Sequence, residues 1–128
     1  MRQFVPNSPF AAALGIELVG IGEDAATLRL PWRSDLATIG DVVHGGAIST
    51  LADMAVMAAA WATEDVPADL RGVTVSLTVN FLDAARAEDL EASGRVVRRG
   101  RSLTCCEADV RGADGRLVAK ALGTYKVG

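Results

Sequence analysis

The apolar positions of this chain follow two different periods, and each period predicts its own kind of element. Residues 47–62 form a long apolar segment that holds seven alanines and no Gly or Pro. This segment predicts a helix of about 16 residues, roughly 24 Å long. Since it is apolar nearly all round, we expect the helix to be buried on several sides by a sheet, a partner subunit or both.

Alternation of apolar and polar residues predicts strands elsewhere. The clearest strand is 73–82, where one face carries five apolar residues, namely Val73, Val75, Leu77, Val79 and Phe81. A hairpin is expected from strands at 16–21 and 25–32, and further strands at 89–98, 102–110 and 116–126. Ser8 and Gly15 bracket a short predicted helix at 10–14, whereas residues 33–43 show no regular pattern.

The order of these elements indicates the fold class. Consecutive strands joined by short turns favour an antiparallel sheet, and one long helix laid across its apolar face gives a two-layer α+β domain. We therefore expect an antiparallel sheet of five to six strands around one long central helix. At 128 residues the chain predicts a single domain, 1–128.

Composition and charge narrow the partners. The formal net charge of −3 argues against nucleic acid as the main partner. The longest unbroken apolar run, 54–62, is too short to span a membrane, and the N-terminus lacks the apolar region of a secretory signal, so we expect a cytoplasmic protein. Cys105 and Cys106 are adjacent and would point to opposite faces of a strand, which suggests neither a disulfide nor a metal site.

One charged residue stands out in the predicted helix. Asp53 is its only charged residue and follows the turn His44-Gly45-Gly46. A structural alternative is that Asp53 complements the helix N-terminus, but it lies about two turns inside, beyond the first turn where that benefit falls off. A lone carboxylate in an apolar helix therefore favours a catalytic role.

These residues resemble a known family. Val43-His44-Gly45-Gly46-Ala47 followed by Leu51-Ala52-Asp53 is similar to the signature of hotdog-fold acyl-CoA thioesterases of the PaaI-like branch. The likeness extends in the same order over Pro9-Phe10 to Ile16, the strand end Asn80 to Ala85, the stretch Gly100 to Leu103, and the closing Ala119 to Thr124. The resemblance covers nearly the whole chain and implies a hotdog fold.

The resemblance also implies a mechanism for thioester hydrolysis. Asp53 would act either as a nucleophile or as the general base for water. The backbone N–H of Gly45 or Gly46, with Gly45 as the leading candidate, would stabilise the oxyanion at the helix N-terminus. For His44, a positioning role and proton transfer both stay open, and the glycines have the alternative of serving only as turn residues. Thr74 matches a Ser or Thr that some members use to orient the water, with an ordinary strand residue as the alternative.

The chain departs from the family pattern at two positions. Thr38 stands where many relatives have asparagine, and Asp41 stands where they have glycine. The resemblance further suggests that the basic turn of Arg98, Arg99 and Arg101 meets the phosphate groups of coenzyme A, to which arginine is well suited. A solvated hairpin tip is the alternative.

The resemblance implies a homodimer with shared active sites, assembled further into a homotetramer. A rise of 1.5 Å per residue separates Asp53 from Gly46 by roughly 10 Å, so two protomers would be needed to bring acid and oxyanion donor together. An acyl-CoA substrate is expected, with no metal and no cofactor, and with neither nucleic acid nor membrane as partner. An acyl-CoA-binding hotdog protein without turnover, or a hotdog dehydratase or hydratase, are the alternatives. The acyl group is not readable, although Met54, Met57, Trp61 and Phe81 are candidates for lining its pocket as well as for plain core.

Overall fold

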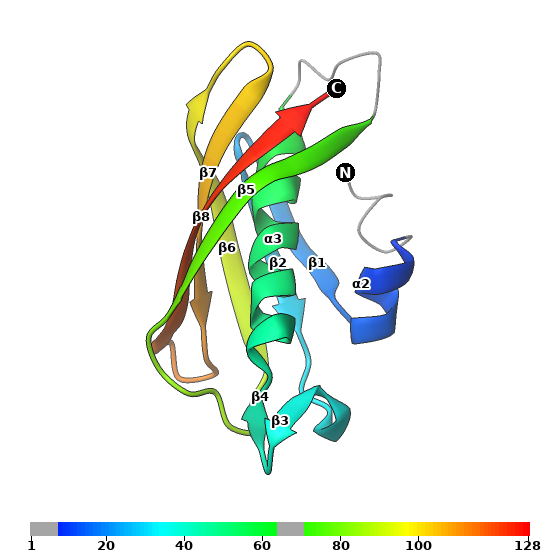
Figure 1. Ribbon diagram of the computed structural model, residues 1–128, viewed down its shortest axis with the longest axis vertical. Coiled ribbons are helices and arrows are strands. Elements are labelled where there is room, and N and C mark those ends of the chain that lie inside the picture. The colour runs from blue at the N-terminus through cyan, green and yellow to red at the C-terminus, as the bar shows by residue number, and fades with distance from the viewer. Residues whose placement is uncertain (1–7, 64–70) are drawn as a thin grey trace.

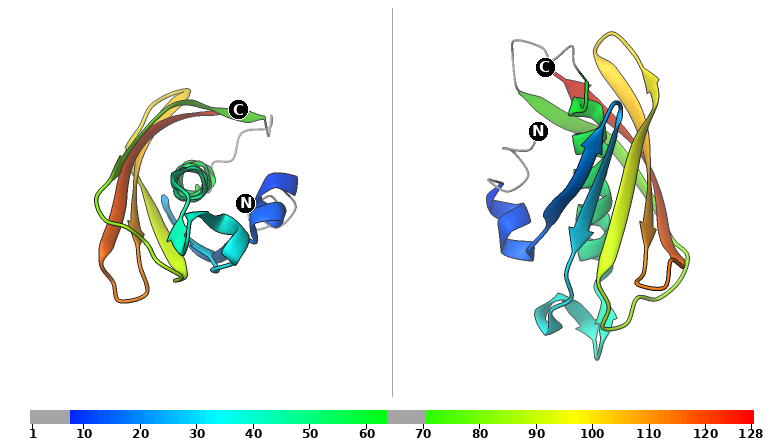
Figure 2. Two further views of the ribbon diagram at one scale, coloured as in Figure 1. Left: turned by 60° about the horizontal axis from the view of Figure 1, so that its bottom comes forward. Right: turned by 180° about the vertical axis from the view of Figure 1, so that it is seen from behind.

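The computed structural model describes residues 8–63 and 71–128, and its main feature is a curved antiparallel sheet that wraps around one long helix (Figure 1). The helix α3 spans Gly45–Trp61 and lies in the concave side of the sheet (Figure 2). The sheet has the strand order β1-β2-β6-β7-β8-β5. Its strands are β1 Glu17–Gly22, β2 Ala25–Leu30, β5 Gly72–Phe81, β6 Leu90–Arg99, β7 Leu103–Arg111 and β8 Leu117–Val127. The expected α+β hotdog fold is confirmed.

The short N-terminal helix forms as its flanking residues predict. Helix α2 spans Pro9–Leu14, and the Ser8 hydroxyl accepts a hydrogen bond from the Ala11 N–H at 3.4 Å. Gly15 ends the helix in the left-handed region, at φ +76°, where a residue without Cβ is favoured. Helix α2 lies on the open side of the curved sheet (Figure 2).

The long helix packs very closely against the sheet. A Cβ built on Gly94 of β6 would lie 2.4 Å from the carbonyl oxygen of Ala55, so only glycine permits this approach. The core around the helix holds Leu28, Leu51, Val56 and Val110, all fully buried. The sheet nevertheless leaves one stripe of α3 half-exposed, and that stripe comprises Ser49, Thr50, Asp53, Met54 and Met57. The expectation of burial by the sheet therefore holds for most of the helix but not for the stripe that carries Asp53.

Contrary to the prediction from the sequence, the edge strand β5 does not alternate regularly along its whole length. A bulge lies between Thr74 and Ser76, where the pairing with β8 shifts from Tyr125 to Thr124. The extra residue changes which side chains share a face. Val73 and Val75 are consequently more than half exposed, as is Phe81 at the end of the strand, so the prediction that all five apolar residues share one face was wrong.

Residues 33–43 are more regular than predicted. A 3-10 turn, Ser34–Leu36, precedes a two-stranded ribbon of β3 Ala37–Ile39 and β4 Val42–Val43. The ribbon turns at Gly40, whose φ of +59° suits glycine. It lies beyond the N-terminal end of α3, whereas the β6–β7 turn lies at the opposite end (Figure 1).

Cys105 and Cys106 point to opposite sides of β7, as predicted. Cys106 is fully buried among the core residues, and Cys105 is half-buried. Burial raises the pKa of the Cys106 thiol to about 11.

Candidate active site

The turn His44-Gly45-Gly46 forms the N-terminus of α3. The helix begins at Gly45, two residues earlier than predicted, because His44 acts as its N-cap. The Gly46 N–H donates to Nδ1 of His44 at 2.7 Å, so this bond assigns the proton of a neutral imidazole to Nε2. Among the described residues the Gly45 N–H has no hydrogen-bond acceptor. Of the two candidate oxyanion donors, Gly45 is therefore the free one.

Gly45 opens into a cleft of about 420 Å³ at this end of the molecule. The ring of Phe81 approaches within 3.4 Å of the point that a Cβ on Gly45 would occupy. Thr38 of β3 lines the same cleft, and so does the connection that follows β5. The structure thus brings Thr38 and Gly45 to the same cleft.

His44 and Gly46 line a second, smaller cleft on the other side of the turn. This cleft measures about 220 Å³ and lies between α2 and the first turns of α3. Its apolar wall includes Phe10 and Leu14 of α2. The turn therefore separates two clefts, one that Gly45 lines and one that His44 and Gly46 line.

Asp41, the second departure from the family pattern, has a structural partner. Its carboxylate accepts from Nη1 of Arg86 at 3.2 Å, and its carbonyl accepts from the Ala87 N–H at 2.9 Å. Asp41 thereby ties the β3–β4 ribbon to the connection between β5 and β6.

Asp53 and Thr74 form a second cluster, halfway along α3. The Thr74 hydroxyl donates to Oδ1 of Asp53 at 2.7 Å, in a part-buried position. Thr74 reaches the helix because it faces inward before the β5 bulge, in register with Tyr125 of β8. A hydrogen bond from a fixed hydroxyl orients the carboxylate.

Tyr125 belongs to this cluster and was missed in the sequence. Tyr125 is the β8 partner of Thr74 in the register of the sheet. Burial raises the pKa of Tyr125, the hydrogen bond from Trp61 opposes that, and the charge of Asp53 raises it further. The Trp61 Nε1–H donates to the Tyr125 hydroxyl at 3.1 Å, and the rings meet edge to face. Only the strand register reveals this neighbour, because Tyr125 lies 72 positions from Asp53 in the sequence.

Within one protomer, the cluster of Asp53 and Thr74 is separate from the cleft that Gly45 lines. Eight residues of helix put Gly45 and Asp53 about 12 Å apart along the axis. Seven residues of strand put Thr74 and Phe81 about 23 Å apart along β5. Neither Asp53 nor Thr74 lines the cleft that holds Gly45 and Thr38.

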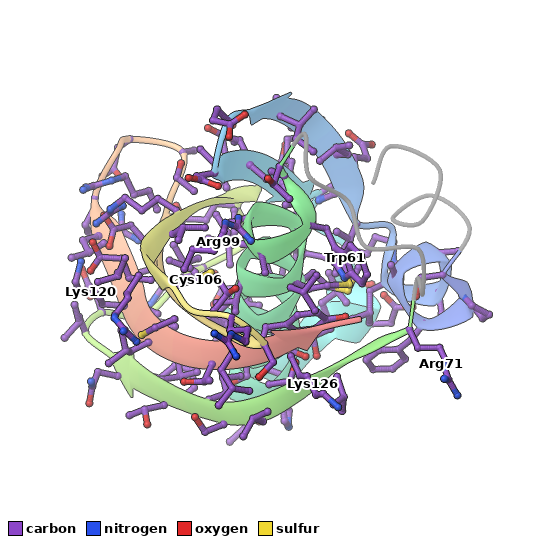
Figure 3. The ribbon with its side chains drawn as sticks, turned by 90° about the horizontal axis from the view of Figure 1, so that it is seen from above. Trp61, Arg71, Arg99, Cys106, Lys120 and Lys126 are labelled. Atoms are coloured by element: carbon purple, nitrogen blue, oxygen red, sulfur yellow. The ribbon has the colours of Figure 1, made fainter. Side chains whose placement is uncertain are left out.

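The basic turn lies at the far end of α3 from His44. Nη1 of Arg99 donates to the Ala60 carbonyl at 2.9 Å, and Nη2 donates to Asp24 at 2.7 Å, so Arg99 helps to cap the C-terminus of the helix (Figure 3). Arg98 and Arg101 are exposed. The three arginines therefore do not share the end of the molecule that carries the Gly45 cleft.

Residues 8–63 and 71–128 contain no group of three or more His, Cys, Asp or Glu side chains placed to hold a metal ion. None of their helices has the length and apolarity needed to cross a membrane.

A six-stranded antiparallel sheet around one helix, with a glycine turn at the N-terminus of that helix and an acid inside it, defines a hotdog-fold protein of the thioesterase type. The chain belongs to the thioesterase superfamily, whose family model matches residues 40–119.

Individual relatives support this assignment. A Saccharolobus solfataricus protein named "Putative esterase SSO2140" is 28% identical over 114 residues, covering 89% of this chain and 79% of that protein. The structure of the conserved protein PA5202 from Pseudomonas aeruginosa is 32% identical, with a TM-score of 0.84 and 94% of each chain covered. The E. coli PaaI protein from the phenylacetic acid degradation operon has the same fold, at 23% identity and a TM-score of 0.84, with 94% of this chain and 85% of that one covered.

Proposed function

We propose that this protein is an acyl-CoA thioesterase that works as a homodimer, with Asp53 of one protomer and Gly45 of the other at each active site. The observation that carries the proposal is that the Asp53–Thr74 cluster and the Gly45 cleft lie at opposite ends of the edge strand β5. Thr74 and its hydrogen-bonded Asp53 lie at the start of the strand. Phe81, in contact distance of the Gly45 position, lies at its end.

An edge strand with this layout suits pairing with its own copy. β5 ends the sheet, and Val73, Val75 and Phe81 are each more than half exposed on it. An unpaired apolar edge is a template for another strand. If two copies of β5 pair antiparallel about a two-fold axis, the start of each strand lies beside the end of the other. Such a pairing brings the Asp53 cluster of each protomer to the Gly45 cleft of its mate.

The chemistry then follows from the two halves. The Asp53 carboxylate either removes a proton from a water that attacks the thioester carbon, or attacks that carbon itself to give a mixed anhydride that water later hydrolyses. In both cases the C–S bond breaks, and the CoA thiolate leaves and takes up a proton. Thr74 orients the carboxylate, and the Gly45 N–H, at the positive end of the helix, donates to the oxyanion.

His44 and Thr38 have supporting roles in this proposal. His44 occupies the Gly46 N–H and so leaves Gly45 as the donor that faces the cleft. Thr38 offers a shorter hydroxyl where the family has an amide, and it would contact the carbonyl or the water through the cleft it shares with Gly45.

The basic turn extends the proposal to the CoA phosphates. Eight residues of helix separate Asp53 from the end of α3, about 12 Å. At each active site, Arg98 and Arg101 would therefore come from the same protomer as Asp53 and bind the phosphates of the substrate. Arg99 already bonds Ala60 and Asp24. Replacing Arg98 and Arg101 together should raise KM for an acyl-CoA and leave KM unchanged for the matching acyl-pantetheine, which lacks the nucleotide phosphates.

The decisive experiment removes the acid and the oxyanion donor in separate variants and then combines the two variants in one dimer. Asp53→Asn removes the base or nucleophile. Gly45→Pro removes the N–H and adds a ring whose Cβ would lie in ordinary contact with Phe81, at 3.4 Å. The helix should tolerate it, because proline is accepted at the first helical position and the extended backbone of His44 is compatible with a following proline. We expect each homodimer to lose about 10²-fold or more in kcat on a panel of aryl and fatty acyl-CoAs.

A mixture of the two variants, unfolded and refolded together, tests the sharing. Half of randomly assembled dimers combine one chain of each kind, and each of these has one intact site, so about a quarter of wild-type activity should return. No recovery in proven mixed dimers would refute the shared site. Binding of acyl-CoA by the wild type without any hydrolysis would instead favour the non-catalytic acyl-CoA-binding protein.

A further inference from the structure

The wall of the Gly45 cleft is held in place from outside the site. Residues 82–85, directly after β5, line this cleft together with Thr38 and Gly45. They begin the connection to β6, which runs beside β4 at the lower end of the molecule (Figure 1). Nothing in the function proposed so far explains how this irregular wall keeps its shape.

Arg116, the residue before β8, contacts the wall at several points. Its Nε pairs with the Asp83 carboxylate at 2.7 Å, and its Nη2 donates to the Ala84 carbonyl at 3.0 Å. The same Nη2 lies 3.0 Å from Glu88, further along the connection. One guanidinium, whose five donors lie in a fixed plane, thus binds three points of a single segment.

Glu88 fastens the same segment to the β7–β8 turn. Its carboxylate accepts from the Arg86 N–H at 3.1 Å and from the Ala113 N–H at 3.0 Å. Burial alone would raise the pKa of Glu88, but these two N–H donors and Arg116 outweigh it and hold the pKa below its ordinary value. The carboxylate is therefore well satisfied in its ionised form.

The ribbon that carries Thr38 is attached to the other side of this segment. Asp41 binds the Arg86 guanidinium and the Ala87 N–H, and the Val43 N–H donates to the Ala85 carbonyl at 2.9 Å. Ala87 adopts the left-handed region at φ +44°, which is strained for a residue with a Cβ. The segment is therefore pinned between the ribbon and the β7–β8 hairpin.

We propose that Arg116 is a positioning residue of this enzyme: it holds the segment 82–88 against the β3–β4 ribbon and thereby sets the distance between Thr38 and the Gly45 N–H. The inference rests on the proposed thioesterase function and deepens it. Asp41, in place of the family's glycine, contributes to the same positioning, because it joins the β3–β4 ribbon to the segment that Arg116 holds.

If Arg116 only stabilised the fold, its loss would lower the melting temperature, whereas a positioning role predicts little change. The carboxylates of Asp83 and Asp114 that face Arg116 are at least half exposed, and exposed ion pairs contribute little to global stability. Glu88 is mostly buried, with 16% of its side chain exposed, but its carboxylate keeps the N–H donors of Arg86 and Ala113 when Arg116 is lost. Loss of Arg116 should then leave the melting temperature nearly unchanged while it loosens the segment locally.

The test compares Arg116→Gln with Arg111→Gln in the same hairpin. Arg111 bonds the Gly115 carbonyl at 3.0 Å and lies 3.9 Å from Asp109, so it contacts no part of the cleft wall. We expect only Arg116→Gln to speed hydrogen exchange of the Val43 and Ala87 amides and to lower kcat about 10-fold, with KM changed less than kcat. Arg116→Lys should recover only part of kcat, because an ammonium replaces the Asp83 pair but not the planar fork.

The outcomes separate the inference from the proposed function. Unchanged exchange in Arg116→Gln, or faster exchange with wild-type kcat, would overturn the positioning role. Faster exchange together with lower kcat and an unaltered melting temperature would support it. If the wild type hydrolyses no thioester, the thioesterase proposal fails, and the exchange comparison still decides whether Arg116 holds the segment.

Discussion

The contact between His44 and Gly46 gives a quantitative prediction. A Cβ on Gly46 would lie 2.9 Å from Nδ1 and 3.1 Å from Cε1 of His44, so Gly46→Ala must displace the imidazole and break its hydrogen bond to the Gly46 N–H. Loss of an N-cap costs about 1 kcal/mol, whereas replacing glycine by alanine in a helix gains roughly 0.5 to 1 kcal/mol. Gly46→Ala should therefore change the unfolding free energy by less than about 0.5 kcal/mol.

A double-mutant cycle isolates the contact. His44→Ala alone should lose the cap and cost about 1 kcal/mol. In the double variant there is no ring to displace, so Gly46→Ala should stabilise the His44→Ala protein by the full helix-propensity gain. The coupling free energy should be about 1 kcal/mol, equal to the cap that both single variants lose. Urea unfolding measures each corner, and each kcal/mol corresponds to a shift of about 4 °C in Tm for a domain of this size.

Activity completes the same cycle. The displaced imidazole leaves the Gly46 N–H free and disturbs the turn, so we expect Gly46→Ala to lower kcat at nearly unchanged stability. Free energies that add within about 0.3 kcal/mol would show that the two residues do not interact and would refute the steric reasoning.

Three further predictions concern the packing around the site. Tyr125→Phe removes the acceptor of the buried Trp61 N–H and should cost about 1 to 3 kcal/mol in urea unfolding; a neutral result would mean that water satisfies the indole. Gly94→Ala places a Cβ 2.4 Å from the Ala55 carbonyl oxygen and should lower the unfolding free energy by roughly 3 kcal/mol or more, with wild-type stability contradicting the close approach. Burial raises the pKa of Cys106 from its ordinary 9.0 to about 11. Between these pH values the unfolded chain loses its thiol proton first, so the unfolding free energy should fall as pH rises from 9 to 11, by at most roughly 3 kcal/mol. Cys106→Ala should remove this decline.

The regular elements were predictable because their signals are local. The helix has strong intrinsic propensity, the short helix has its cap and its terminating glycine, and the strands alternate. Each predicted strand was displaced by only one or two residues at its ends. The β3–β4 ribbon was not predictable, because two and three residues of strand carry too little periodicity to detect, and its support comes from distant residues such as Ala85 and Ala87.

The candidate site was predictable only in its chemistry. The sequence pointed to Asp53, Gly45 and Thr74, and it favoured Gly45 over Gly46 as the oxyanion donor without a physical reason for the choice. The hydrogen bond of His44 decides which N–H is free. Tyr125 and Arg116 carry no local signal, since each acts through strand register or through a loop far away in the sequence.

The bulge in β5 joins the fold to the proposed function. Without the shift between Thr74 and Ser76, regular alternation would put Thr74 on the face opposite Leu77, away from the helix. The bulge turns Thr74 inward to Asp53 and at the same time leaves Val73 and Val75 exposed at the sheet edge. An apolar edge of this kind is a liability in a monomer but an interface in a dimer. The same irregularity therefore orients the acid and creates the surface through which, in our proposal, that acid reaches the other protomer.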